Sequence, residues 1–165
     1  MKEPYINECK VLKQNCTYTG ETHHLIAVSL RKKAMWFQLV PAIIAAGSAA
    51  VSALGVSQGW LLLLTLVSSI VTAVASVLNP NKSYQEHLSA AKSFTMLKHD
   101  ARFLADTEST TLTDDAFIER VRNLHEKYNA LLQNVPATDS KFFEKARRIV
   151  QTGIHEPDEE AGAIK

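Results

Sequence analysis

The stretch AMWFQLVPAIIAAGSAAVSALGVSQGWLLLLTLVSSIVTAVASVLNPN, from Ala34 to Asn81, is uncharged and differs in this from the rest of the sequence. It contains no histidine, and all 18 Lys and Arg residues and all 17 Asp and Glu residues lie outside it. The whole-chain averages hide this division, because 21% charged residues and a net charge of +1 would suit an ordinary soluble domain of 165 residues. With only two cysteines, they still exclude a strongly basic nucleic-acid binder, an acidic disordered chain and a disulfide-dense secreted module.

The uncharged stretch divides into two apolar segments, residues 34–54 and 60–78, around a short Gly-rich sequence. As α-helices these segments would measure roughly 32 and 28 Å, close to the roughly 30 Å of a hydrocarbon core. Backbone groups in lipid must satisfy one another, which also favours helices. The stretch 34–81 is therefore predicted to be an antiparallel transmembrane hairpin. A buried helical hairpin in a soluble protein is the alternative, although a soluble core helix should carry a polar stripe with some charge.

The charges that flank the hairpin predict its orientation. Arg31, Lys32 and Lys33 precede the first segment and Lys82 follows the second, whereas the connecting loop has no charge. By the positive-inside rule, both termini are expected to be cytoplasmic.

Each apolar segment has a weakly polar face. On a helical wheel, the hydroxyl residues of the second segment fall within roughly a 100° arc. Two explanations stay open: hydroxyl and small residues let helices pack closely, or they line a pore when several hairpins assemble. One hairpin cannot enclose a conduit, so a pore needs a homo-oligomer, for example a tetramer. The candidate pore-lining residues are Thr65, Ser68, Ser69, Thr72 and Ser76 in the second segment, with Gln38 and Ser52 in the first.

The rest of the chain is predicted to be helical. An N-terminal cytoplasmic helix covers residues 1–33, with Gly20 as an interruption, and further cytoplasmic helices cover 82–153. Residues 107–113 are expected to form a Ser/Thr-rich loop, and 154–165 a disordered acidic tail. The predicted fold class is an all-α membrane protein, a two-helix transmembrane hairpin with a cytoplasmic α-helical bundle. Its later helices are expected from about Ser83 to Leu104, from Thr113 to Pro136 and from Asp139 or Ser140 to about Thr152.

Apolar seams and basic clusters are the candidate contact surfaces of the helical part. Phe94, Leu97, Ala101 and Leu104 recur at helical spacing and predict a seam for packing or for an oligomer. The two cysteines are expected to be small apolar seam residues rather than a disulfide. The candidate contacts for an anion, a nucleotide or lipid headgroups are Arg120, Arg122, Arg147 and Arg148, and the alternative is an ordinary solvated face.

The common catalytic and metal-binding sequence patterns are absent. The sequence has no phosphate-binding glycine loop, no GxSxG, no HExxH and no CxxC. The His23-His24 pair lacks partners at metal-ligand spacing. We therefore expect no enzyme activity, no cofactor and no metal.

The organisation of the chain resembles the SLATT family of bacterial two-transmembrane effector proteins. The resemblance covers most of the sequence and consists of the N-terminal helix, the basic border, the hairpin with its short loop and a post-membrane helix. The residues that carry it are Arg31-Lys32-Lys33, Leu78-Asn79-Pro80, the run His87-Leu88-Ser89-Ala90-Ala91-Lys92-Ser93-Phe94-Thr95-Met96-Leu97-Lys98, and then Asp100 and Arg102.

The resemblance implies a function that residue patterns alone do not give. It implies a pore-forming or membrane-disrupting effector of the bacterial inner membrane, acting in abortive-infection anti-phage defence. It also implies activation by a nucleotide second messenger, or by a linked nucleotidyltransferase or reverse-transcriptase sensor. The competing hypotheses are a membrane-anchored helical scaffold that recruits a partner without conducting, and, with less support, a small carrier or envelope-stress protein.

Overall fold

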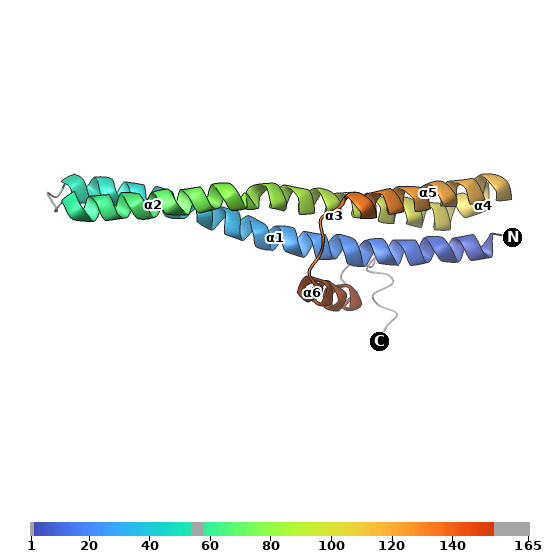
Figure 1. The fold of residues 1–165 in the computed structure, drawn as a ribbon. Helices are drawn as coiled ribbons and strands as arrows, with labels where there is room; N and C mark the ends of the chain where they lie inside the picture. The colour runs from blue at the N-terminus through green and yellow to red at the C-terminus, as the bar shows by residue number, and fades with distance from the viewer. Residues whose placement is uncertain (1, 54–57, 154–165) are drawn as a thin grey trace. The chain divides into compact units, whose positions relative to one another are not determined.

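The protein is described by a computed structural model that covers residues 2–53 and 58–153. Every regular element in these two ranges is a helix, and no strand occurs in them (Figure 1). The elements are α1 (Glu3–Ala53), α2 (Gln58–Leu78), α3 (Pro80–Phe103), a short π-helix η1 (Leu104–Glu108), α4 (Ser109–Thr111), α5 (Asp114–Asn134) and α6 (Ser140–Gln151).

The chain divides into two compact units. The first, here called the bundle, is drawn from Met1–Ile26 and Glu86–Lys165, and the second, the hairpin unit, is Ala27–Gln85. These divisions lie a few residues away from the predicted domain limits at 33/34 and 81/82. The predicted turn around residues 55–59 lies largely outside the described residues, and the predicted acidic tail lies wholly outside them.

The N-terminal part of α1 was wrongly predicted to be interrupted at Gly20. The structure has one continuous helix from Glu3 to Ala53. A Cβ atom on Gly20 would lie 3.3 Å from the Cβ of Phe94 and 3.6 Å from the carbonyl oxygen of Ala91. This glycine therefore serves close packing of α1 against α3 rather than a helix end.

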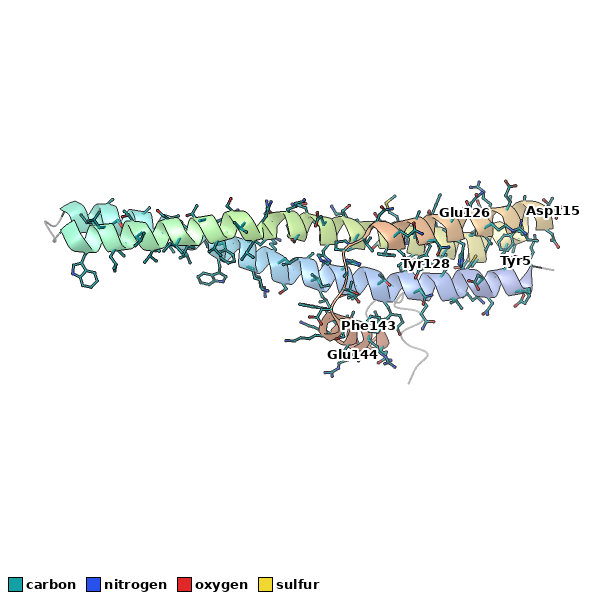
Figure 2. The ribbon with its side chains drawn as sticks, viewed as in Figure 1. Tyr5, Asp115, Glu126, Tyr128, Phe143 and Glu144 are labelled. Atoms are coloured by element: carbon teal, nitrogen blue, oxygen red, sulfur yellow. The ribbon has the colours of Figure 1, made fainter. Side chains whose placement is uncertain are left out.

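The core of the bundle joins three helices by their apolar seams. Cys9, Leu12 and Cys16 of α1 pack with seam residues of α3 and with Phe117 of α5, and both cysteines are free. Burial raises the pKa of each cysteine thiol to about 11, with Glu8 adding to the effect at Cys9. The cysteines are thus buried seam residues, as predicted, and weak nucleophiles. Figure 2 shows Tyr5 and Tyr128, which pack against this core, on α1 and α5.

The predicted loop at residues 107–113 is mostly helical. Helix α3 passes into η1 and then into α4, and only Leu112 and Thr113 separate α4 from α5. Ser and Thr side chains bond back to carbonyl groups here, with Ser109 Oγ donating to the Ala105 carbonyl at 2.6 Å. Such bonds let hydroxyl residues remain in a helix, so the Ser/Thr content did not imply a loop.

The junction between α2 and α3 is a single residue. Asn79 has a φ of 39°, and its side-chain oxygen accepts a hydrogen bond from the Lys82 backbone N–H at 3.3 Å. Pro80 follows at the first helical position, where its missing N–H costs no hydrogen bond. The Asn79 side chain therefore caps the start of α3.

Candidate functional site

The hairpin unit pairs the second half of α1 with α2, which run side by side in opposite directions (Figure 1). In α2 the less exposed positions recur at alternating spacings of three and four residues. They are Leu61, Leu64, Ser68, Val71 and Ala75. In α1 they include Ala34, Phe37, Pro41, Ile44 and Ser48. These residues form the pairing seam of the hairpin.

Outside this seam the hairpin unit exposes large apolar side chains. Trp36 and Ile43 of α1 are 66% and 64% exposed, and Leu62 and Val77 of α2 are 70% and 85% exposed. Within the described residues, one helical stretch, which includes α2, contains a window long and apolar enough to cross a membrane, and none of that window is buried. A continuous exposed apolar surface of this extent indicates a surface that meets lipid or another protein.

The predicted hydroxyl stripe borders the pairing seam. Ser68 lies in the seam, whereas Thr65, Ser69, Thr72 and Ser76 are exposed. Each exposed hydroxyl residue directly follows a seam residue, so these four side chains form a continuous line along one edge of the helix pair. We call this line the hydroxyl edge. Of the five predicted hydroxyl residues in α2, only Ser68 packs between α1 and α2.

Three of the four hydroxyls of this edge, those of Thr65, Ser69 and Thr72, are bonded within their own helix. Ser69 Oγ donates to the Thr65 carbonyl at 2.9 Å and Thr72 Oγ1 to the Ser68 carbonyl at 2.9 Å. Thr65 Oγ1 donates to the Leu61 and Leu62 carbonyls at 3.0 and 2.9 Å. A hydroxyl that donates in this way keeps its oxygen lone pairs as acceptors. Thr65, Ser69 and Thr72 can therefore face lipid without an unpaired donor, and can also accept hydrogen bonds from water.

Gln38 of α1 is brought to the same edge. A groove of about 410 Å³ is lined by Gln38 and Pro41 of α1, by Thr72 and Ser76 of α2, and by Asn79 to Asn81 at the junction. The structure thus brings three of the predicted pore-lining residues to one groove: Gln38, Thr72 and Ser76. The side chain of Ser52, the remaining predicted position in α1, lies outside the described residues.

The predicted seam of α3 is buried against other helices of the same chain. Phe94 and Ala101 are fully buried, and Leu97 and Leu104 are 7% and 5% exposed. All four belong to the bundle core with residues of α1 and α5. The structure therefore leaves none of these residues open to a second copy.

The four candidate basic contacts are all exposed and divide between two helices. Arg120 and Arg122 lie on α5, and Arg147 and Arg148 on α6. Arg120 also lines a groove of about 300 Å³ together with Asp100, Glu108 and Lys127. Acidic residues at this groove offset its positive charge.

The bundle contains a buried histidine pair that was not predicted from the sequence. The Nδ1 atoms of His23 and His87 lie 2.9 Å apart, and the two residues are 1% and 8% exposed. One imidazole must donate its Nδ1–H to the other, so the accepting ring is neutral. Burial and the neighbouring His87 lower the pKa of His23 to about 4. Burial also lowers the pKa of His87, against an opposing effect of Glu86.

The His23 ring also stacks on Phe94, with ring centroids 5.7 Å apart. Its Nε2 is buried without a hydrogen-bond partner among the described residues. No group of three or more potential metal ligands occurs in the same part of the chain. The pair is therefore a neutral contact between α1 and α3. A signal for it was present in the sequence, because His87 lies seven residues before Phe94 and therefore on the same face of a helix.

The helices and the exposed apolar surface define a class, an all-α protein that associates with membranes. The chain belongs to the SLATT family, since residues 6–157 match the family model described as "SMODS and SLOG-associating 2TM effector domain family 4". The resemblance found in the sequence is confirmed, and with it the general assignment of a membrane-associated effector. No curated protein and no solved structure matches the chain.

Proposed function

We propose that the protein is an oligomeric two-transmembrane effector whose hydroxyl edge lines a water-filled path through the bacterial inner membrane. The observation that carries the proposal is the exposure of Thr65, Ser69, Thr72 and Ser76 along one edge, where pairing of α1 with α2 does not use them. In a ring of hairpins, this edge is the weakly polar surface that can face a shared central space. Both helices of the hairpin cross the membrane in this arrangement, and both termini are cytoplasmic.

The chemistry of the edge sets the properties of such a pore. Residues 34–81 contain no charged side chain, so the path has neither a charged selectivity ring nor a proton relay. Hydroxyl oxygens and the Gln38 amide can hydrogen-bond water along the path. The conductance is therefore expected to discriminate weakly between small ions, which suits loss of membrane potential and abortive infection.

Gating would reach the hairpin through the α2–α3 junction. Only Asn79 separates α2 from α3, and the Lys82 N–H bond to its side chain fixes the turn between them. A change in α3 is therefore transmitted directly to α2. The activating signal would be a nucleotide second messenger or a linked sensor protein, and it must bind the open state better than the closed one to shift the equilibrium.

We assign no enzymatic step to this chain. The proposed partners of the protein are further copies of itself and the lipid bilayer. A passive anchor is the second candidate function, because the hydroxyl bonds of Thr65, Ser69 and Thr72 are made within α2 itself. In that case the bundle recruits a partner, and the hairpin only holds the protein at the membrane.

The test of the pore is the membrane potential of bacteria that express the protein together with its neighbouring genes. Wild-type protein should depolarise the cells. Thr72→Leu and Ser69→Leu should abolish depolarisation at equal membrane content, whereas the control Val74→Leu, on the exposed apolar face of the same helix, should retain it. An unchanged potential and normal growth with the wild-type protein would contradict the pore. Full depolarisation by both variants would show that the hydroxyl edge does not line it.

Replacement of the hairpin by an unrelated two-helix anchor separates the two candidate functions. Defence against phage should be lost in the chimera if the hairpin conducts. Retained defence would support the scaffold.

A further inference from the structure

Helix α6 differs from the other bundle helices in the arrangement of its charges. Its sequence SKFFEKARRIVQ contains four basic residues and one acidic residue, Glu144. Lys141, Lys145, Arg147 and Arg148 are all exposed. Within residues 2–53 and 58–153, none of these four side chains has an ion-pair partner.

The apolar residues of α6 occupy one face. Five positions fall within an arc of about 120° when successive residues are placed 100° apart. Lys145 borders this arc on one side and Arg147 on the other. Such a basic-bordered apolar face is typical of helices that lie in the plane of a membrane surface. The five apolar positions are Phe142, Phe143, Ala146, Ile149 and Val150.

The apolar face is only partly used inside the protein. Ala146, at its centre, is fully buried, but Phe143 is 41% exposed. The Phe143 ring contacts Tyr18 of α1 at a centroid distance of 6.4 Å. Figure 2 shows Phe143 and Glu144 on α6, which Figure 1 shows crosswise to the N-terminal part of α1. The helix is thus held to the bundle at its centre and keeps an aromatic edge and four cations exposed.

Helix α5 provides the contrast. It carries Arg120, Arg122 and Lys127, but also four acidic residues, two of them in its first turn. Its charges are mixed, and its apolar residues Phe117, Val121 and Leu124 are buried in the core. Of the two helices that contain the candidate basic contacts, only α6 combines an excess of positive charge with an exposed aromatic side chain.

We propose that α6 binds the anionic surface of the membrane in which the hairpin is anchored. The four cations, which have no ion-pair partner among residues 2–53 and 58–153, complement anionic headgroups, and the exposed part of Phe143 reaches the interfacial region. Because the chain tethers α6 to the bilayer, a weak contact suffices to populate the bound state. The inference rests on the proposed membrane location and does not depend on whether the hairpin conducts.

The experiment uses the full chain in vesicles of phosphatidylcholine, with or without phosphatidylglycerol. A fluorophore on Gln151→Cys reports the approach of α6 to lipids that carry a headgroup quencher. The native cysteines are buried and have raised pKa values, so they compete poorly for labelling. Quenching should appear with phosphatidylglycerol and should fade as salt rises from about 0.1 to 1 M, where the screening length falls from about 10 to 3 Å.

Matched variants test the role of charge. Each cation near an anionic surface changes binding about fivefold, so Arg147→Gln with Arg148→Gln should lower the bound-to-free ratio about 25-fold. Arg147→Lys with Arg148→Lys keeps the charge and should retain the contact. The control pair Lys10→Gln with Lys127→Gln removes two exposed cations from α1 and α5 and should retain it too.

Three results would overturn the inference. Quenching could be the same with and without phosphatidylglycerol. The Lys10 and Lys127 control could lose as much quenching as the arginine pair. Fluorescence could instead respond to inorganic tripolyphosphate in phosphatidylcholine vesicles and not to phosphatidylglycerol, which would make α6 a site for a soluble anion. None of these readings measures conductance, so failure here is distinct from failure of the pore.

Discussion

The hairpin unit and the bundle use the same helical spacing for opposite purposes. In the bundle, residues spaced by three and four bury Phe94 and Phe117 completely. In the hairpin unit, the same spacing pairs two helices through Leu61, Leu64 and Val71, while large apolar residues such as Leu62 remain exposed. Periodicity therefore determines which face of a helix packs, whereas the residues on its other faces indicate whether lipid or water surrounds the helix.

The largest expected effect comes from core truncation in the bundle. Phe94→Ala should destabilise the bundle by about 3–5 kcal/mol, because it removes a fully buried ring and leaves a cavity. Hydrogen exchange of the α3 amides in detergent micelles measures this change. Leu66→Ala is the matched control in the hairpin unit, where the side chain is 60% exposed. It should leave bundle stability within about 0.5 kcal/mol. If both variants lowered bundle stability equally, the contrast between a buried bundle core and an exposed hairpin surface would be contradicted.

Acid should weaken the bundle through the histidine pair. The pKa of His23 is about 4 in the folded protein, against 6.5 for an unperturbed histidine. The stabilisation from the neutral pair is therefore complete above pH 6.5 and is lost as the pH falls toward 4. Between pH 7 and 5, His23 should lower the free energy of unfolding by about 2 kcal/mol.

Denaturation at several pH values measures this loss. His23→Asn should remove most of it, whereas His99→Asn, at an exposed position of α3, should keep it. If the free energy of unfolding changed with pH equally in the wild type and in His23→Asn, the neutral histidine pair would be contradicted. The hairpin residues 34–81 contain no titratable side chain, so the helix content of this region should not change over the same range.

A smaller effect is expected at the start of α6. The Asp139 side chain accepts a hydrogen bond from the Lys141 N–H at 2.9 Å, and Asp139→Ala should weaken the helix by about 1 kcal/mol. Thr113 occupies the same position before α5 but makes no side-chain cap bond. Thr113→Ala should therefore cost less, as judged by hydrogen exchange in the first turn of each helix. Equal protection of α6 in wild type and Asp139→Ala would show that this cap contributes nothing.

The smallest effect is expected in the hairpin unit. Thr72→Val keeps the shape of the side chain and removes only a hydroxyl that donates to the Ser68 carbonyl. Because that carbonyl sits inside a continuous helix, the stability of α2 should change by less than about 0.5 kcal/mol. Thermal unfolding followed by circular dichroism in micelles checks this value. A large loss would show that the hydroxyl edge holds the hairpin together.

Much of the helical framework was predictable because it depends on local patterns. Residue type and spacing were enough to predict the charge-free stretch, the cysteine seam and the start of α6 at Asp139 or Ser140. The continuity of α1 through Gly20 could not be predicted. A glycine between two apolar seams gives the same local signal whether it ends a helix or allows another helix to pack closely. Only the approach of Phe94 decides between these roles.

Two features of the candidate sites depend on tertiary placement and could not be obtained from spacing. His23 follows Gly20 by three residues on the seam of α1, but its partner His87 lies 64 positions away in the chain. In the hairpin unit, the hydroxyl residues fall on one arc of α2 whichever edge faces α1. The structure shows that the seam takes Ser68 and leaves Thr65, Ser69, Thr72 and Ser76 exposed.

The most direct test of the contrast between a lipid-facing hairpin and a water-facing bundle is thiol labelling in native membranes. Leu66→Cys and Val74→Cys replace exposed apolar residues of α2, and Met96→Cys replaces a 68% exposed residue of α3. The native cysteines are buried and give a low background. A water-soluble thiol reagent should rapidly modify the Met96→Cys variant and leave the Leu66→Cys and Val74→Cys variants unmodified. Reaction of the two α2 variants as fast as the α3 variant would contradict a hairpin surrounded by lipid.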